Sequence, residues 1–596
     1  MNNKIMNLGE HIPGGKKLPE CLLTMGEKLL GFHIFNVAHS RIEADQNAGC
    51  TDNFFRLACK HLPLNYEVKG LENIPAEGPC VIVSNHPHGM SDGLMIGDIA
   101  MKVRSDIRIV VNEFLHCVRG MRPYQITVDV YGGEDAKRAN MSGMREILKW
   151  LREGHCLIVF PSGSAASWSE QDGRVIDDPW QENIAAIIRK VKPTVVPMHF
   201  SGENGWLFQT VTRICKEKRS ALLAREIKRD RRMLHQVRIG KPIKANRIEL
   251  FESDAALSDY LRLCSMILRY PETAAANTTN ALKRNLQDIE APLSPDELQQ
   301  EIDTLPEEEH LLYTHKGTGL QIYTAQGSKI PRLLREIGIQ REITFRAVGE
   351  GSGNACDTDE YDLYYDHLIM WDPAEKRIAG AYRMGRTDEI IKARGTTGIY
   401  NSEFFTLGNE FVNYVKNGME MGRAFITAAY QKHPASLDTL WMGIGRFINK
   451  HPQYRYLYGT VSVSSDYSVR SRALIYEYLK CHCLDTELAK HVQAKTPPTD
   501  MDLLSEDARL LPAGLSDLRA LSSLVSDQEP DERSIPVLLR QYLRMNGKMV
   551  SFNVDSEFGD TLDCLVVVDL HNAPDRLMSR YCGAPLKSLD ATESEA

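Results

Sequence analysis

The sequence lacks any long hydrophobic run. No stretch of its 596 residues approaches the roughly 18–20 consecutive apolar residues that a membrane-spanning helix needs. The N-terminus also lacks the pattern of a secretory signal peptide. We therefore expect a cytoplasmic protein. The segment 18–35, "LPECLLTMGEKLLGFHIF", is apolar enough to lie on a membrane surface, or to form a helix that packs on its own domain.

The chain has no excess of basic residues and no tight cluster of cysteines. Its formal net charge is −8, which argues against bulk attraction to nucleic acid, so no nucleic-acid partner is expected. The 13 cysteines are scattered, and the tightest group, Cys481-His482-Cys483, lacks the spacing of a zinc site. We expect free thiols and no metal. Internal repeats and low-complexity tracts are absent from the sequence as well.

The length predicts more than one domain, because 596 residues are too many for a single core. In the first half, short β-branched runs alternate with helical stretches. The helical stretch 136–154 ends at Gly154, as a helix commonly does. Strands separated by helices indicate an α/β domain with a mainly parallel sheet. The expected strands are 79–85, 106–112, 156–163, 194–200 and 235–243.

The second half predicts another α/β or α+β domain after a polar linker. Within the linker, Ser294, Pro295 and Glu297 are typical of a helix start with a capping box. Further strands are expected at 320–326, 364–372, 377–385, 420–430 and 454–464. The predicted divisions are an N-terminal helical or membrane-surface segment 1–55, a first domain 56–270, a linker 271–312, a second domain 313–575 and a disordered tail 576–596.

The stretch "SNHPHGMSDG", residues 84–93, places polar side chains just where a buried strand ends. A histidine at that position can reach a cleft, and a neutral imidazole can take a proton from a hydroxyl. A carboxylate on its other ring nitrogen would set the tautomer. His86 and Asp92 therefore read as a base with its orienting acid, and the nucleophile would be a substrate hydroxyl. The alternative reading is a pair of ordinary turn residues.

This stretch resembles the signature of the glycerolipid acyltransferase superfamily. The common form has four residues between His and Asp, whereas five separate His86 from Asp92, which resembles the lyso-ornithine lipid O-acyltransferase and hemolysin-like branch. The match continues through 160–163, 177–205 and 237–243. The resemblance implies that His86 and Asp92 are catalytic. It implies that the substrate is bound by Asn85, His88, Gly89, Phe160, Pro161, Ser162 and Gly163.

A second departure bears on the acceptor. Relatives that use a phosphate-bearing acceptor carry Phe-Pro-Glu-Gly-Thr-Arg-Ser, whose Arg can contact the phosphate. This chain has "FPSGSAA" at 160–166, without the acid or the base. We therefore expect an acceptor that has no phosphate.

The second half resembles the ornithine N-acyltransferases, which are related to acyl-homoserine-lactone synthases and have the N-acetyltransferase-like (GNAT) α/β fold. The series "ITFRAVGE", "YDLYYDHLIMWD", "IAGAYRMG", "YNSEFF" and "GMEMGRAFI" carries this resemblance over about 315–570. It implies a catalytic Glu420, because the attacking amine must lose a proton. It implies substrate binding by Arg346, Glu350, Asp366, Arg383 and Arg423. Structural salt bridges are the alternative for each.

Together the two resemblances imply a bifunctional ornithine lipid synthase, with a glycerolipid-acyltransferase-like α/β domain followed by a GNAT α/β domain. The second domain would acylate ornithine with a 3-hydroxyacyl chain, and the first would esterify the 3-hydroxyl of that lyso-ornithine lipid. No tightly bound cofactor is expected. The donor would be the 4'-phosphopantetheine thioester of acyl carrier protein, an acidic partner for the basic segment 213–232, although a solvated helix face or a contact with anionic lipid explains that segment equally well.

We expect the protein to lie on the inner face of the bacterial inner membrane. Two other functions stay open. One is the same synthesis with glycine or another amino acid. The other is a non-catalytic lipid-binding protein at the membrane surface.

Overall fold

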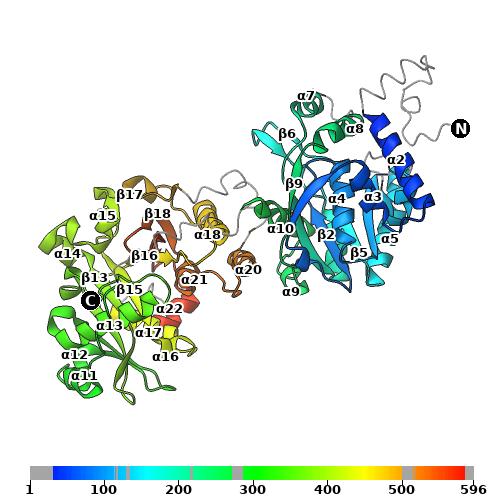
Figure 1. Cartoon of the computed structure of the whole chain (residues 1–596). Coiled ribbons are helices and arrows are strands. Elements are labelled where there is room, and N and C mark those ends of the chain that lie inside the picture. Colours follow the sequence, from blue (N-terminus) through cyan, green and yellow to red (C-terminus); the bar gives the residue numbers. More distant parts are fainter. Residues whose placement is uncertain are drawn as a thin grey trace. The chain divides into compact units, whose positions relative to one another are not determined.

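A computed structural model shows two folded units (Figure 1). It describes residues 31–112, 115, 118–128, 134–214, 219–270, 286–499, 515 and 517–583. By residue contacts, the first unit comprises Met1–Pro271 with Ser505–Gln528, and the second comprises Glu272–Leu504 with Glu529–Ala596.

The first unit is built on a seven-stranded sheet. Neighbouring strands run parallel except β8 and β9, so the expected mainly parallel α/β sheet is confirmed. The central strand β2 is buried along its whole length, as its run of apolar residues predicts. In spatial order the strands are β1 (Asn65–Lys69), β9 (Leu234–Ile239), β8 (Thr194–Phe200), β2 (Cys80–Ser84), β5 (Cys156–Val159), β3 (Ile107–Asn112) and β4 (Gln125–Val128).

Helices surround this sheet (Figure 1), and a small hairpin adds β6 (Ser167–Ser169) and β7 (Arg174–Ile176). The helix expected at 136–154 is confirmed as α5, and Gly154 follows it with a φ of 91°. Phe55, Met95 and Ile158 belong to the core between helices and sheet. The helices are α2 (Phe32–Asn47), α3 (Phe54–His61), α4 (Met90–Ala100), α5 (Glu134–Arg152), α6 (Glu182–Val191), α7 (Trp206–Ile214), α8 (Arg219–Asp230), α9 (Ala245–Ile248), α10 (Asp254–Met266) and α20 (Leu518–Gln528).

The second unit has an eight-stranded sheet in which neighbouring strands are antiparallel, with the pair β15 and β16 parallel. The five strands expected from the sequence are confirmed as β11, β12, β13, β15 and β16. In order the sheet contains β10 (Leu311–Thr314), β11 (Gln321–Gln326), β12 (Asp366–Asp372), β13 (Arg377–Arg386), β15 (Gly418–Ile426), β16 (Tyr456–Val463), β19 (Thr561–Asp569) and β18 (Lys548–Asp555).

A separate two-stranded ribbon pairs β14 (Phe405–Leu407) with β17 (Val492–Ala494). The helices of this unit are α11 (Pro295–Ile302), α12 (Glu307–His310), α13 (Pro331–Arg346), α14 (Thr387–Arg394), α15 (Asn409–Tyr414), α16 (Ala428–Gln431), α17 (Ser436–Lys450), α18 (Val469–His482), α21 (Val537–Arg544) and α22 (Asp575–Cys582).

The structure differs from the sequence prediction in two segments. Residues 295–314, within or next to the predicted linker, form α11, α12 and β10, and Leu298 and Ile302 are buried in the core of the second unit. The predicted capping box of Ser294 and Glu297 is confirmed at the start of α11. The predicted disordered tail begins inside α22, which buries Met578 because it packs on α17. Residues 271–285 and 584–596, and 18–30 of the apolar N-terminal segment, lie outside the described residues.

Candidate active sites

The loop between β2 and α4 brings His86 and Asp92 together in the first unit. Nδ1 of His86 lies 3.2 Å from Oδ2 of Asp92. Asp92 is fully buried at the first turn of α4, and the same oxygen accepts hydrogen bonds from the backbone N–H of His88 (2.8 Å) and of Gly89 (3.0 Å). Asp92 therefore caps the start of α4, and the same carboxylate faces Nδ1 of the His86 ring and so sets the orientation of that ring. The five-residue spacing fits because the loop turns sharply at Gly89, whose φ is 68°.

The His86 ring stands at the wall of a cavity. It stacks on Phe160 with the ring centroids 4.0 Å apart, and its side chain keeps 18% of its surface exposed. Its Nδ1 is not aligned for a hydrogen bond with Asp92 here, and such contacts commonly tighten when substrate binds. With Nδ1 facing Asp92, Nε2 is the nitrogen available to take a proton from a substrate hydroxyl.

This cavity has a volume of about 700 Å³ and a mainly apolar wall. Apolar side chains reach it from α2, α3, α4, β3 and α5, among them Ala38, Phe54, Leu94, Ile109 and Ile147. Such a lining suits hydrocarbon chains, because burial of each methylene contributes about 0.8 kcal/mol. The His86 ring therefore stands beside a space that can hold an acyl chain.

The residues 160–163 follow β5 and line the same cavity. Ser164 donates a hydrogen bond to Asp178 (2.7 Å), and both residues also line it. Phe160, Pro161, Ser162 and Gly163 thus lie beside His86, as the resemblance implied. Gly89 lines the cavity too, and a Cβ there would lie 2.6 Å from Leu223.

Asn85 and His88 have structural contacts instead of lining this cavity. The Asn85 amide exchanges two hydrogen bonds with the backbone of Phe200, which ties β2 to β8. Nδ1 of His88 lies 3.2 Å from Oδ1 of Asp230 at the end of α8, and Nε2 lies 3.0 Å from the carbonyl oxygen of Ser201. The sequence singled out both residues as substrate contacts, whereas in the structure both side chains are buried and neither lines the cavity.

In the second unit, β15 and β16 separate after a short stretch of pairing. They pair only from Gly418 to Glu420 and from Tyr456 to Tyr458, although both strands continue further. A cavity of about 370 Å³ lies where they diverge, lined by residues 421–424 of β15 and 460–462 of β16. The backbone groups on these diverging edges do not pair with each other, so they can bond an extended chain that carries amides.

Arg423 stands in this wall with a φ of 47°, at a point where the register of β13 and β15 shifts. Side chains three residues apart on a strand point to opposite faces, which accounts for the different surroundings of Glu420 and Arg423. The Arg423 guanidinium lies 5.3 Å from the centroid of the Tyr400 ring and 3.4 Å from Asp357.

Glu420, the residue predicted to be catalytic, lies outside the cavity. It is 1% exposed and accepts hydrogen bonds from Tyr365 Oη, the backbone N–H of Tyr400 (3.0 Å), and both the backbone N–H (2.6 Å) and the side-chain amide (2.5 Å) of Asn401. Burial raises the pKa of Glu420, and these hydrogen bonds oppose the rise. The arrangement holds the 400–401 loop against β15.

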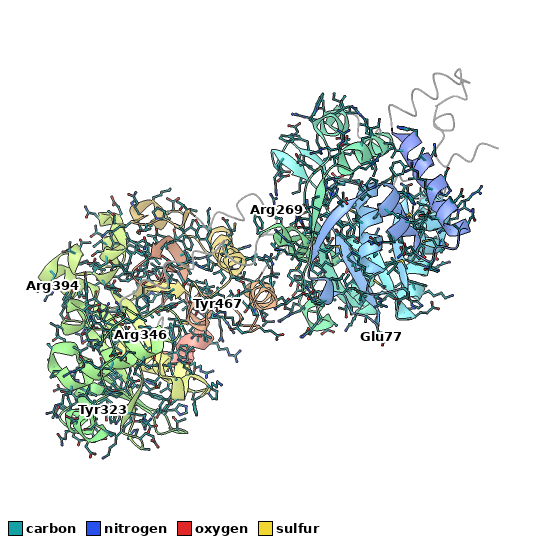
Figure 2. The ribbon with its side chains drawn as sticks, viewed as in Figure 1. Glu77, Arg269, Tyr323, Arg346, Arg394 and Tyr467 are labelled. Carbon is teal, nitrogen blue, oxygen red and sulfur yellow. The ribbon has the colours of Figure 1, made fainter. Side chains whose placement is uncertain are left out.

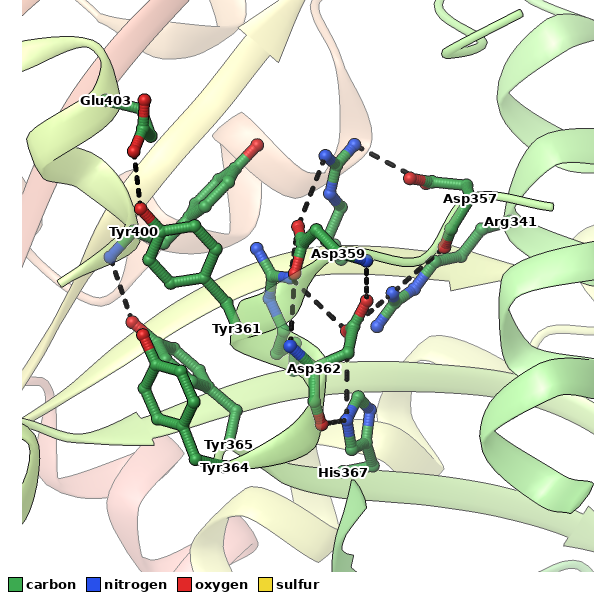
Figure 3. A network of polar contacts seen from close by, with 12 residues as sticks. Arg341, Asp357, Asp359, Tyr361, Asp362, Tyr364, Tyr365, His367, Tyr400 and Glu403 are labelled. Carbon is green, nitrogen blue, oxygen red and sulfur yellow. Dashed lines mark hydrogen bonds and ion pairs between the residues drawn. The ribbon is translucent and has the colours of Figure 1, made fainter. Parts of the chain in front are cut away.

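A buried network of charges is drawn in Figure 3 with Tyr365 and Tyr400, two of the residues that donate hydrogen bonds to Glu420. Arg341 lies 2.8 Å from Asp362, and Arg383 pairs with Asp359 (2.6 Å) and Asp362 (3.3 Å). The Arg383 guanidinium also lies 4.3 Å from the centroid of the Tyr400 ring. Sequence reasoning named Arg383 alone among these charged groups. The acid-rich stretch "DTDEYD" at 357–362 holds Asp359 and Asp362 and was a signal that sequence reasoning missed.

Of the remaining predicted residues, one lines the cavity and two do not. Arg346, labelled in Figure 2, pairs with Glu342 at 2.6 Å, and Asp366 pairs with Arg386 at 2.7 Å, both away from the cavity lining. Glu350 lines the cavity, together with Asp555 and Asp563, which the sequence did not single out. Burial, with the charges of Asp563 and Asp466, raises the pKa of Glu350 to about 7. Burial, with the charge of Asp555, raises the pKa of Asp563 to about 7.

Two further observations concern the described residues only. None of their helices is both long and apolar enough to cross a bilayer. They also contain no group of three or more His, Cys, Asp or Glu side chains arranged to hold a metal ion.

Comparison with known proteins identifies both domains. Residues 50–253 match the acyltransferase family, and residues 340–442 match the acetyltransferase (GNAT) domain family. The predicted order, an acyltransferase domain followed by a GNAT domain, is confirmed.

Curated relatives resemble parts of the chain. It is 32% identical over 301 residues to a glycine N(alpha)-acyltransferase of Bacteroides thetaiotaomicron, covering 48% of this chain and 87% of that protein. It is 28% identical over 221 residues to a lyso-glycine lipid O-acyltransferase of Phocaeicola vulgatus, covering 35% of this chain and 75% of that protein. It is 24% identical over 269 residues to an L-ornithine N(alpha)-acyltransferase of Brucella abortus, covering 44% of this chain and 84% of that protein.

Proposed function

Since the chain belongs to the family of amino-acid N-acyltransferases that includes the B. thetaiotaomicron glycine enzyme, and carries an acyltransferase domain ahead of its GNAT domain, we propose that it makes ornithine lipid in two steps. The GNAT domain acylates the α-amine of ornithine with a 3-hydroxyacyl chain. The acyltransferase domain then acylates the 3-hydroxyl. The observation that carries this proposal is the presence of two separate cavities in one chain, each at one acyltransferase motif.

For the ester step, Nε2 of His86 takes the proton of the 3-hydroxyl as its oxygen attacks a second thioester. Asp92 stabilises the imidazolium that forms. The imidazolium then gives its proton to the departing sulfur. The apolar cavity beside His86 supports this role, because the lyso-lipid and the donor both bring hydrocarbon chains to the reaction.

For the amide step, the space between β15 and β16 receives the thioester, and the amino acid enters from the side lined by carboxylates. The choice of ornithine is supported by the three carboxylates of this cavity, Glu350, Asp555 and Asp563, which exceed in number its two lining arginines, Arg423 and Arg533. A second ammonium on the acceptor side chain would give these carboxylates another partner.

Glycine is the second candidate acceptor, and a specific observation favours it. The N-acyltransferases named for glycine are more similar to this chain than those named for ornithine, at 29–32% identity against 24–25%. A lyso-glycine lipid O-acyltransferase is also among the relatives.

The donor in this proposal is the phosphopantetheine thioester of acyl carrier protein, which is acidic. The basic residues of α8, such as Lys228 and Arg229, support electrostatic docking of that partner. We also propose that the chain works at the cytoplasmic face of the inner membrane, where its lipid product is delivered.

Reconstitution with the purified full chain tests the proposal. The chain is mixed with 3-hydroxyacyl thioester of acyl carrier protein and either ornithine or glycine, and products are identified by mass spectrometry. We expect N-acylated ornithine first, then the diacylated lipid when a second acyl thioester is added. Preferential acylation of glycine would show that glycine, and not ornithine, is the acceptor. The absence of any acylated amino acid would contradict the proposed function.

A further inference from the structure

The GNAT cavity contains a carboxylate that is free to act as a base, and it is not Glu420. Glu350 follows α13 and lines the cavity, and its carboxylate accepts no hydrogen bond from the described part of the chain. Glu420 is enclosed, with its oxygens engaged by Tyr365, Tyr400 and Asn401. A group that must collect a proton from a bound amine needs access to that amine, which only the first of these two glutamates has.

Asp563 supplies the second half of the arrangement. It projects from β19, is 4% exposed and lines the same cavity. Its Oδ1 accepts a hydrogen bond from Ser462 Oγ at 2.7 Å, while Oδ2 accepts none from the described residues. Because Asp563 lines the cavity, this oxygen is open to a ligand that supplies a donor. An ammonium group, with three N–H donors and a positive charge, is the chemical class that fits.

Resting on the proposed function, we propose that Glu350 is the general base of the amide step and that Asp563 holds the ammonium of the amino acid beside it. The Glu350 carboxylate takes one proton from the ammonium. The freed nitrogen bonds to the thioester carbonyl carbon, the C–S bond breaks, and its electron pair leaves on sulfur. The second proton of the attacking nitrogen ends on that sulfur as a thiol, and Glu350 returns its proton to water.

The electrostatics of the cavity agree with this assignment. Burial and the charges of Asp563 and Asp466 raise the pKa of Glu350 to about 7, which suits a base at neutral pH. The other charged groups lining the cavity are Asp555 on β18, Arg423 on β15 and Arg533. Arg423 counters the charge on Asp563, while Arg533 pairs with Glu529. Removal of the Asp563 charge should therefore lower the pKa of Glu350.

The test is the pH dependence of amino-acid acylation by the full chain, with the 3-hydroxyacyl thioester of acyl carrier protein as donor. Glu350→Gln should lower kcat by about 10²–10⁴-fold at pH 7 and regain rate above about pH 9, where solvent deprotonates the amine. Asp563→Asn should raise KM for the amino acid. It should also move the acid limb of the pH–rate profile to lower pH by about one unit. Asp466→Asn should move it less, because Asp466 is exposed.

A matched control is Glu360→Gln, which changes an exposed glutamate outside the cavity lining and should leave the profile unchanged. Wild-type rate in Glu350→Gln at pH 7, or an unmoved acid limb in Asp563→Asn, would overturn the assignment. The Asp563→Asn shift is read from an active enzyme, so misfolding of one variant cannot imitate it. Failure of the proposed function looks different, because the wild-type chain would then acylate no amino acid.

Discussion

Nδ1 of His88 lies 3.2 Å from Oδ1 of Asp230 in the interior of the first unit, and neither side chain is more than 1% exposed. Asp230 ends α8, so this pair joins that helix to the loop that carries His86. The His88 ring also contacts His235, with the ring centroids 4.6 Å apart. His88 thus helps to position the loop that carries His86, and its charge is set by buried neighbours.

The His88–Asp230 pair predicts a loss of stability at alkaline pH. Burial lowers the pKa of His88, but the close contact with Asp230 and the charges of Asp92 and Asp230 outweigh it and raise the pKa to about 9. Because the folded pKa exceeds the unfolded one, the contribution is complete below about pH 6.5 and disappears as pH rises through about 9. The free energy of unfolding of the first unit should fall by about 3 kcal/mol over this range.

Chemical denaturation of the full chain at several pH values measures this effect. Asp230→Asn should be less stable at neutral pH and should lose most of the decline between pH 6.5 and 9. An equally steep decline in that variant would assign the pH dependence to other groups.

His86→Ala should stop the ester step and leave the amide step intact. The variant removes the group that accepts the hydroxyl proton, which costs about 10²–10⁴-fold in rate. Lyso-lipid should therefore accumulate, as measured by chromatography of the products. His155→Ala is a suitable control, because His155 pairs with Asp106 and does not line the cavity. Normal formation of the diacylated lipid by His86→Ala would show that His86 is not the base.

Tyr365→Phe should weaken the second unit without changing proton transfer. Tyr365 donates to the buried carboxylate of Glu420, and the loss of that donor leaves the carboxylate partly unsatisfied. We expect a loss of about 1–3 kcal/mol in the free energy of unfolding and an unmoved acid limb in the rate profile of N-acylation. A large shift of that limb would instead place Glu420 in the chemistry.

The sequence predicted the first site better than the second for a physical reason. His86 and Asp92 lie in one short loop, and the residues 160–163 follow a neighbouring parallel strand, so local pattern and sheet topology bring them together. Glu350 and Asp563 come from segments far apart in the chain. Asp563 stands within the apolar run "TLDCLVVVD", which reads as an ordinary buried strand. Only the packing of β19 beside β16 reveals that its carboxylate faces a cavity.

The same reasoning explains why Glu420 and Arg346 were singled out. Both are charged residues at positions where the family resemblance places functional groups, but pattern alone does not show whether a charge faces ligand or protein. The bulge at Arg423 is a consequence of strand register, which the sequence does not specify. The network of Arg341, Asp362 and Arg383 depends on the packing of α13 and the turn 360–363 against β13.

The acyltransferase site should discriminate against lysophosphatidic acid. Ser162 and Ala165 stand at the positions of Glu and Arg in the Phe-Pro-Glu-Gly-Thr-Arg-Ser form, and both line the cavity. A phosphate needs positive donors, each worth about 1.5–3 kcal/mol. In direct competition at equal concentrations, lyso-ornithine lipid should be acylated at least about tenfold faster. Preferential formation of phosphatidic acid would contradict this reading of the "FPSGSAA" segment.

The central claim, that one chain carries out both acylations of an aminolipid, is tested most directly by mass spectrometry of lipids from a host that lacks such lipids. Cells that express the wild-type chain should contain a new diacylated lipid with an ornithine headgroup fragment. Cells that express His86→Ala should contain only its monoacylated precursor, and cells that express Glu350→Gln should contain neither. A glycine fragment would correct the acceptor and keep the two-step synthesis, whereas the absence of any new aminolipid from wild-type cells would contradict the account.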